Sequence, residues 1–174
     1  MKSNLDSIIA QSEHIRLRLT TEADLDYVLA LEQDQENASF IFRWSREQHR
    51  RSLFDENLAH LLIEANPENK KVGFILLAGL NDDNHCFALQ RIVVAEKGKG
   101  YGRQALQLIK QLVFETWKGH RLWLDVKEHN ARARHLYGSE GFVVEGTWRE
   151  CLRVGETFES LVIMSILSHE YSAE

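Results

Sequence analysis

The chain has 174 residues, of which 44% are hydrophobic, and its formal net charge is −5 at pH 7. A single hydrophobic core serves about 100–200 residues, so we expect one domain, with a core over residues 14–167 and short flexible termini. The acidic balance argues against a nucleic-acid-binding protein, which needs a basic surface to neutralise phosphates. No run of about 18 apolar residues is present, so we expect no membrane insertion.

The cysteines and histidines carry no recognisable motif. Cys86 and Cys151 lie in separate strand-like segments, so we expect both to be small buried hydrophobes in a reducing compartment. The start of the chain has no basic region followed by an apolar run, which argues against export and for a cytoplasmic protein. His129 and His135 are six residues apart and do not share a helix face, so we expect no metal site.

The first part of the chain predicts a strand and then a helix. Residues 15–19 (IRLRL) alternate apolar and charged side chains, as a half-buried strand does. Thr21 and Asp24 can form a capping box that begins a helix ending near Glu32. Residues 34–44 follow without a regular period.

A second capping box, formed by Ser45 and Gln48, predicts another helix. Leu53, Phe54 and Leu58 continue its apolar stripe at helical spacing. Two helices therefore follow the first strand.

The middle of the chain changes to the period of strands. Residues 60–65 and 71–80 read as strands, and the polar run 81–84 is a turn into a third strand, 85–94. We expect these three strands to form an antiparallel meander.

A glycine-rich loop then opens a helix that ends before Gly119. The expected buried face of this helix consists of Ala105, Leu108, Ile109, Leu112 and Thr116.

The last part of the chain adds a strand at 121–126, a short helix from Asn130 through Tyr137, and two strands around 142–150 and 158–167. The element order predicts an α/β (α+β) domain with a mixed, mostly antiparallel twisted sheet of about seven strands flanked by about four helices.

The loop Lys97-Gly98-Lys99-Gly100-Tyr101-Gly102-Arg103 is a candidate anion site, because backbone N–H groups at a helix start face outward and glycines allow close approach. It lacks the Lys-Ser/Thr pair of a Walker A loop. Gly100, Gly102 and Ala105 also fit a dinucleotide fingerprint, with Asp125 about 20 residues on. The hairpin-linked strands before the loop argue against that NAD-binding oxidoreductase.

Two motifs in order resemble the GNAT acetyltransferase superfamily. Lys97-x-x-Gly100-x-Gly102 is similar to its Gln/Arg-x-x-Gly-x-Gly/Ala loop, with lysine at the first position. A second family pattern is matched by Asn130, Ala133, Leu136, Tyr137, Gly141 and Phe142. The opening IRLR and the closing strands resemble the branch of ribosomal-protein alanine N-acetyltransferases. The resemblance implies a GNAT-like fold with splayed central strands.

The resemblance also implies an acetyl-CoA-dependent N-acetyltransferase that acts by direct transfer on a primary amine, either a protein N-terminus or a small molecule. Main-chain groups of Ile92, Val93 and Val94 would pair with the pantetheine arm, and residues 98–103 would hold the diphosphate. Asn130 would contact the cofactor, and Tyr137 would be the general acid.

The general base is open, because the strand before the glycine loop carries no carboxylate. Glu32 and Glu36 are candidates and His85 is a weaker one, beside a water relay or an amine that arrives neutral. Phe40, Phe42 and Trp44 are expected to line an acceptor pocket.

One alternative of another class is a non-catalytic CoA-binding module that kept the loop. The sequence predicts a monomer or a homodimer and does not identify the acceptor.

Overall fold

The computed structural model describes residues 7–173, and residues 1–6 and 174 of the expected flexible termini lie outside this range. Residues 7–173 contain one eight-stranded sheet in the order β1-β2-β3-β4-β5-β6-β8-β7. The strands are β1 (Ile8–Gln11), β2 (Ile15–Leu19), β3 (Leu58–Ala65), β4 (Lys70–Ala78), β5 (Cys86–Val94), β6 (Arg121–Lys127), β7 (Val143–Val154) and β8 (Thr157–Leu167).

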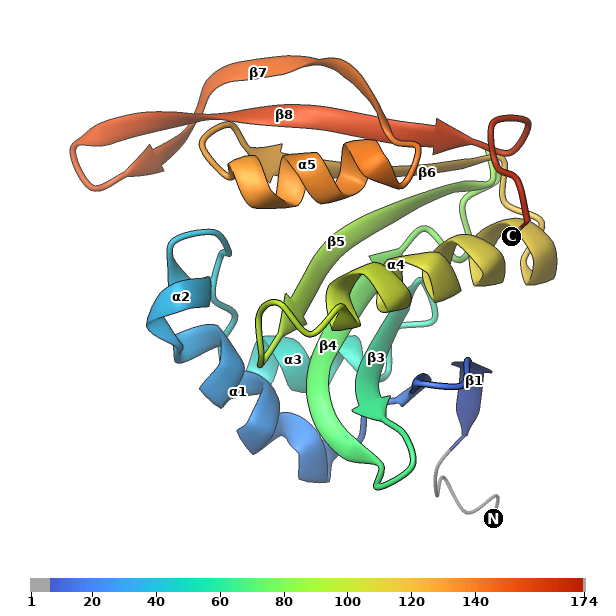
Figure 1. Ribbon diagram of the computed structural model, residues 1–174. Coiled ribbons are helices and arrows are strands. Elements are labelled where there is room, and N and C mark those ends of the chain that lie inside the picture. The colour runs from blue at the N-terminus through green and yellow to red at the C-terminus, as the bar shows by residue number, and fades with distance from the viewer. Residues whose placement is uncertain (1–6, 174) are drawn as a thin grey trace.

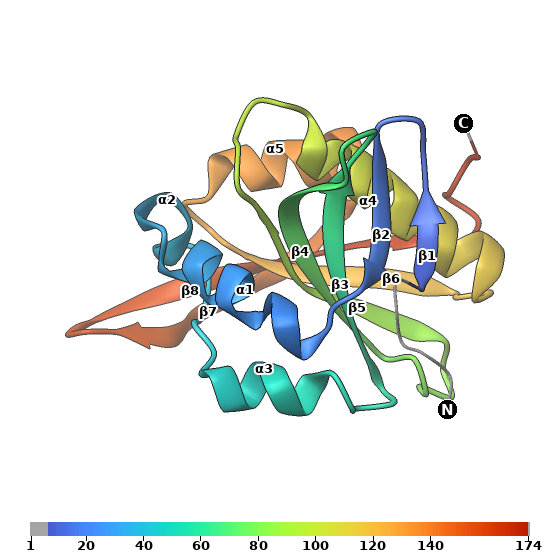
Figure 2. The ribbon, with the colours of Figure 1, turned by 90° about the horizontal axis from the view of Figure 1, so that it is seen from below.

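Helices cover both faces of the sheet (Figure 1 and Figure 2). They are α1 (Leu25–Gln33), α2 (Gln35–Ala38), α3 (Arg46–Ser52), α4 (Tyr101–Gln111) and α5 (Ala131–Ser139), with a 3₁₀ turn η1 (Glu22–Asp24) and a π-helical turn η2 (Leu112–Thr116). The figures show α1 and α3 on one face and α4 and α5 on the other. Within residues 7–173, no helix is long and apolar enough to cross a membrane.

The predicted mixed, mostly antiparallel fold is confirmed. Strands β2 to β5 pair antiparallel with their neighbours, and β5 with β6 is the parallel pair of the described sheet. This arrangement excludes the doubly wound parallel sheet of a dinucleotide-binding domain. Both predicted capping boxes are present, at Thr21 with Asp24 and at Ser45 with Gln48.

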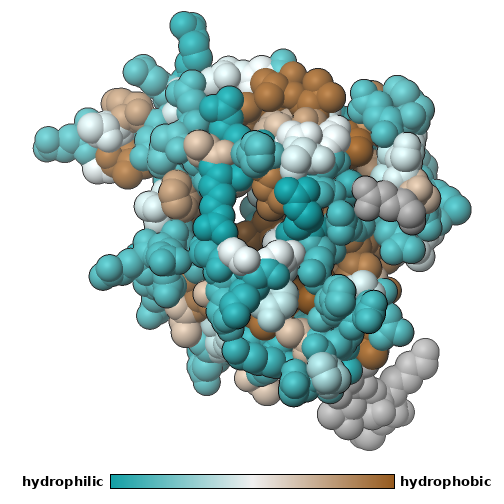
Figure 3. Space-filling model, viewed as in Figure 1, coloured by the Kyte–Doolittle hydropathy of each residue, from teal (hydrophilic) through white to brown (hydrophobic). Residues whose placement is uncertain are grey.

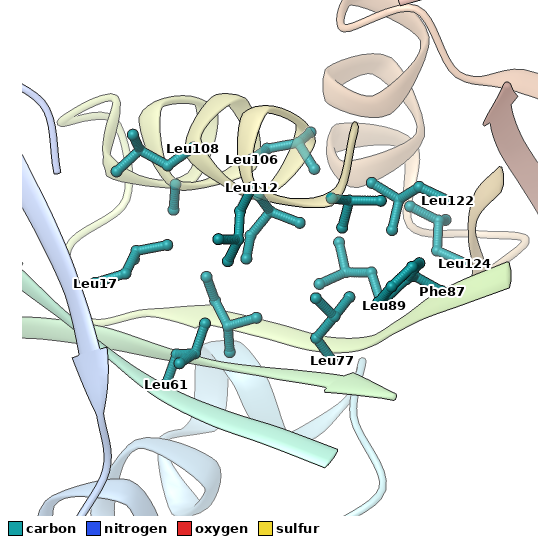
Figure 4. Close-up of a cluster of buried hydrophobic side chains, with 14 of the residues drawn as sticks. Leu17, Leu61, Leu77, Phe87, Leu89, Leu106, Leu108, Leu112, Leu122 and Leu124 are labelled. Carbon is teal, nitrogen blue, oxygen red and sulfur yellow. The ribbon is translucent and has the colours of Figure 1, made fainter. Parts of the chain in front are cut away.

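The main core lies between α4 and the sheet (Figure 4). Leu112 extends from the end of the helix toward the strands that carry Leu61 and Leu77, and Leu106 and Leu108 of α4 belong to the same buried cluster. Leu106 is fully buried, so truncating it to alanine should cost about 2–5 kcal/mol. A second cluster joins α1 to the opposite face of the sheet. The sheet is thus fixed from both sides, and its strand ends form a rigid frame for the site.

The N-terminal strand was not predicted. Ile8–Gln11 pairs with β2 in an irregular antiparallel register, although residues before 14 were expected to be flexible. The segment is only four residues long, so its structure depends on its neighbour rather than on its own periodicity.

Helix α3, which the capping box at Ser45 begins, is shorter than predicted. It ends at Ser52, Phe54 is 71% exposed, and Leu58 begins β3. The carboxylate of Asp55 accepts the N–H of Asn57 at 2.8 Å, which offers the backbone a turn in place of the next helical bonds.

Two further expectations about burial were wrong. Thr116 is exposed, because the π-helical turn closes with Trp117 N–H donating to Leu112 O at 2.9 Å and the extra residue rotates Val113 and Phe114 inward instead. Of the two cysteines expected to be buried, Cys86 is only partly buried, and Cys151 is exposed because it lies on β7, an edge strand of the sheet.

Candidate active site

The predicted splay of the central strands is present between β5 and β6. The two strands pair only where Cys86, Phe87 and Ala88 meet residues 121–123. Beyond Ala88 the edge of β5 that faces β6 has no strand partner among the described residues. A bulge near Gln90, where the register with β4 shifts, bends β5 away. Figure 3 shows the surface hollowed near its centre, with apolar atoms inside.

The glycine loop lies directly after the splayed end of β5 and caps α4. Gly98 and Gly100 have φ values of 80° and 81°, which favour glycine over residues with a side chain. A Cβ atom at Gly98 would meet nothing within 4 Å, so the space in front of the loop is open. The first N–H groups of α4 are therefore available to an anion that approaches the loop.

The cations of this loop do not all face that space. The Lys97 ammonium group donates to Asn37 Oδ1 and, at 3.2 Å, to Val94 O. Burial lowers the pKa of Lys97, and the positive charge of Arg132 adds to the effect. Arg103 pairs with Glu140, and Lys99 is exposed with Glu96 3.8 Å away.

Tyr137 lies on α5, and its ring centroid is 5.9 Å from that of Phe142. The Asn130 side chain caps this helix by accepting Ala133 N–H at 3.2 Å, as predicted. Tyr137 is 8% exposed, and no described residue hydrogen-bonds its hydroxyl. Burial, followed by the negative charge of Asp125, raises the pKa of Tyr137, so the phenol is protonated at neutral pH and free to donate.

Glu32 lies against β5, and its carboxylate is already occupied by contacts with other residues there. It is 1% exposed and accepts from Arg91 and from Trp44 N–H at 3.0 Å, and His49 Nε2 lies 3.2 Å from its carboxylate. Burial alone would raise its pKa, but the close His49 imidazole, the Arg91 charge and the Trp44 bond together hold the pKa of Glu32 below its usual range. It is a fixed anion.

The other two candidate bases lie elsewhere. Glu36 is exposed on α2, one turn beyond the end of α1. His85 lies in the turn before β5, at the opposite end of that strand from Ile92, Val93 and Val94.

Sequence reasoning missed a buried histidine pair behind Glu32. His49 Nδ1 lies 3.1 Å from His60 Nε2, and His60 Nδ1 lies 2.9 Å from Thr20 Oγ1. Burial lowers the pKa of His60 to about 3, with the charges of His49 and Arg91 adding to it. These side chains come from separate elements, so no spacing in the sequence signals the contact.

The predicted aromatic residues Phe40, Phe42 and Trp44 form an aromatic wall along the segment between α1 and α3, and all three are at least partly exposed. Phe40 and Phe42 are 39% and 50% exposed, and the guanidinium of Arg91 lies 5.0 Å from the centroid of the Trp44 ring. The Phe40 ring is 5.6 Å from that of His129.

An open pocket of about 370 Å³ adjoins His129. It is lined by Glu128, His129, Glu150, Phe158, Glu159 and Ser160. Lys127 Nζ lies 2.9 Å from Glu159, which leaves an excess of negative charge. Sequence reasoning missed these three glutamates, whose only signal is the acidic balance of the chain.

Comparisons with known proteins agree with this geometry. A family model described as Acetyltransferase (GNAT) family matches residues 25–142. The chain is 27% identical over 171 residues to spermidine N(1)-acetyltransferase of Escherichia coli K12, covering 92% of this chain and 89% of the relative. The corresponding enzyme of Vibrio cholerae is 24% identical over 168 residues, covering 92% and 96%.

Solved structures have the same fold. The spermidine N-acetyltransferase of Vibrio cholerae in complex with CoA and spermine superposes with a TM-score of 0.81 at 22% identity, covering 91% of this chain and 98% of that one.

Proposed function

The chain belongs to the GNAT family of acetyltransferases, and from that membership we propose how its own residues hold the donor, move protons and select the amine. It is an acetyl-CoA-dependent enzyme that acetylates an amine. The finer resemblance to ribosomal-protein N-acetyltransferases stays a prediction, since the relatives described above are spermidine acetyltransferases.

The donor would occupy the splay between β5 and β6. We propose that the unpaired main chain at Ile92, Val93 and Val94 pairs with the pantetheine arm as an added strand would, and that residues 98–103 hold the diphosphate. The free edge of β5 and the open space before Gly98 support this assignment. Asn130 would contact the donor with the part of its amide that does not cap α5.

The chemistry follows from this placement by direct transfer. The amine nitrogen attacks the thioester carbonyl carbon, the C–S bond breaks, and the Tyr137 hydroxyl gives its proton to the departing sulfur. A β5 N–H group would polarise the carbonyl oxygen.

The proton that the amine loses needs an acceptor. Glu32 would have to release a contact with Arg91, His49 or Trp44 before it could accept a proton. We therefore propose Glu36, or a water that it orients, as the proton acceptor, and Glu32 as the anion that fixes Arg91. The solvent exposure of Glu36 supports this division of roles.

The acceptor that fits best is an aliphatic polyamine, and the three-carboxylate pocket carries this proposal. Glu128, Glu150 and Glu159 surround a space wide enough for an extended chain, beside the aromatic wall. Several spaced ammonium groups match several spaced carboxylates, whereas a single amine matches one. The names of the relatives point to the same class of acceptor.

A thiol-release assay across acceptor classes tests this assignment. We expect kcat/KM for spermidine or spermine to exceed that for an N-terminal peptide or an amino sugar by at least about tenfold. Each lost carboxylate contact should weaken polyamine binding by roughly 1 kcal/mol. Glu150→Gln should then raise the KM for spermine more than that for a monoamine. A peptide as the best acceptor would overturn the polyamine assignment and leave the acetyltransferase activity standing.

We expect a monomer or a homodimer, although one related Vibrio cholerae structure is described as dodecameric. The free edge of β7 and the exposed Val144 and Trp148 on it offer a surface for a second copy. Light scattering on the purified protein would decide. We place the enzyme in the cytoplasm because Cys86 and Cys151 are both free, as in a reducing compartment.

A further inference from the structure

The segment between α1 and α3 is held at three successive points by cationic side chains. Lys97 donates to the side-chain oxygen of Asn37. Lys127 donates to Ser39 O at 2.8 Å. Arg91 donates to Phe42 O. Residues 37–42 therefore depend on three charged donors from elsewhere in the chain.

The three cationic side chains all border the splay between β5 and β6, the slot proposed to hold acetyl-CoA. Lys97 begins the glycine loop, Arg91 lies on β5, and Lys127 ends β6. Arg91 and Lys127 are 8% and 7% exposed, and a cation buried to this degree must be hydrogen-bonded to avoid a large desolvation cost. The wall that carries Phe40 and Phe42 is thus tied to the elements that would hold acetyl-CoA.

Lys97 differs from the other two donors. Arg91 also pairs with Glu32, and Lys127 also pairs with Glu159. The hydrogen bonds of Lys97 go to two neutral oxygens, those of Asn37 and Val94. The Lys97 side chain therefore connects the glycine loop to α2.

Asn37 is built to receive this bond. It is 6% exposed, and its Nδ2 donates to Leu31 O at 3.0 Å, which turns its Oδ1 toward Lys97. A buried amide that is satisfied at both ends holds its neighbour in one position.

We propose that Lys97 is a positioning residue for the acceptor side: it ties residues 37–42 to the rim of the donor slot, so that the amine pocket is shaped by the elements that bind acetyl-CoA. This inference rests on the proposed function. Lysine stands here at the first position of the loop motif, and its nitrogen is committed to α2 instead of to a phosphate.

Steady-state kinetics with both substrates varied will separate the two roles. Lys97→Gln should raise the KM for the amine on the order of tenfold, a usual size of coupling between two sites, and leave the KM for acetyl-CoA within about twofold. Lys97→Arg, which keeps a donor, should retain most of the amine affinity. Asn37→Ala should also raise the KM for the amine, and the effect of the double variant should fall well short of the product of the two single effects, because both substitutions remove the Lys97–Asn37 bond.

Lys99→Gln is the comparison within the same loop. It removes an exposed lysine that does not contact α2, so it should raise the KM for acetyl-CoA and leave the KM for the amine unchanged. Lys118→Gln, an exposed lysine beyond η2, should change neither.

Three results would overturn the assignment. They are a Lys97→Gln effect mainly on the KM for acetyl-CoA, additive effects of Lys97→Gln and Asn37→Ala, and failure of Lys97→Arg to restore the amine KM when CoA binding by calorimetry is intact. A wild-type enzyme that neither binds CoA nor releases thiol would instead refute the proposed function.

Discussion

Replacing Tyr137 with phenylalanine removes the proposed general acid and little else. The ring is 8% exposed and no described residue bonds its hydroxyl, so the free energy of unfolding should change by less than about 1 kcal/mol. General acids contribute about 10²–10⁴-fold. A thiol with a pKa of about 8.5 is a fairly good leaving group even as the unprotonated thiolate, so we expect the lower end of this 10²–10⁴-fold range. We expect kcat to fall about 100-fold, or roughly 2.7 kcal/mol in the barrier.

The assay is thiol release at saturating acetyl-CoA and amine, with CoA binding followed by calorimetry. Tyr137→Phe should bind CoA as the wild type does. Tyr27→Phe is the control, because Tyr27 has a buried hydroxyl without a partner in the described structure, and the kcat of this variant should not change. A kcat of Tyr137→Phe within threefold of wild type would make Tyr137 a core residue and refute the reasoning. A wild type without amine-dependent thiol release would favour the non-catalytic CoA-binding module.

Two further predictions concern carboxylates. Glu36→Gln should lower kcat/KM most at low pH, where the amine is protonated and most needs a proton acceptor; an unchanged pH–rate profile would remove Glu36 from the mechanism. Asp24→Asn should lower the free energy of unfolding by about 3–5 kcal/mol, because it leaves the buried Arg18, now bonded to Asp24 at 2.8 and 3.0 Å, without its full share of negative charge. Burial would raise the pKa of Asp24, but bonds from Arg18, Lys71 and Thr21 hold it well below the usual range. Its stabilisation is therefore complete above the unfolded-state pKa of about 3.9 and lost as the pH falls below it. Urea melts from pH 6 to 2 will test both statements, since Asp24→Asn should flatten the acid limb that the wild type shows.

Local signals in the sequence were sufficient for much of the fold. The capping boxes at Thr21 and Ser45 and the Asn130 cap were predictable because each joins residues three apart, and their hydrogen bonds need no distant partner. The strand at Ile8–Gln11 and the four-residue helix α2 were not, because each is too short to show a period and depends on packing against other elements.

The same division holds at the site. The glycine loop and the segment from Asn130 to Phe142 could be read as motifs because each is contiguous. Arg91 reaches Glu32 across 59 positions, and Lys127 reaches Ser39 across 88. Such contacts depend on how the strands and helices are arranged, and the spacing of the residues in the sequence does not predict them.

The splayed edge of β5 also affects how this enzyme can change. Peptide groups are the same whatever side chains they carry, so the proposed pairing of the donor with the main chain of Ile92 and Val94 would not depend on the identity of these two residues as long as the strand forms. Under this proposal, substitutions at these two positions would be tolerated, and specificity for the amine could change on the aromatic wall without loss of donor binding. An engineer who wants a new acceptor can therefore randomise the wall around Phe40 and Phe42 and leave β5 untouched.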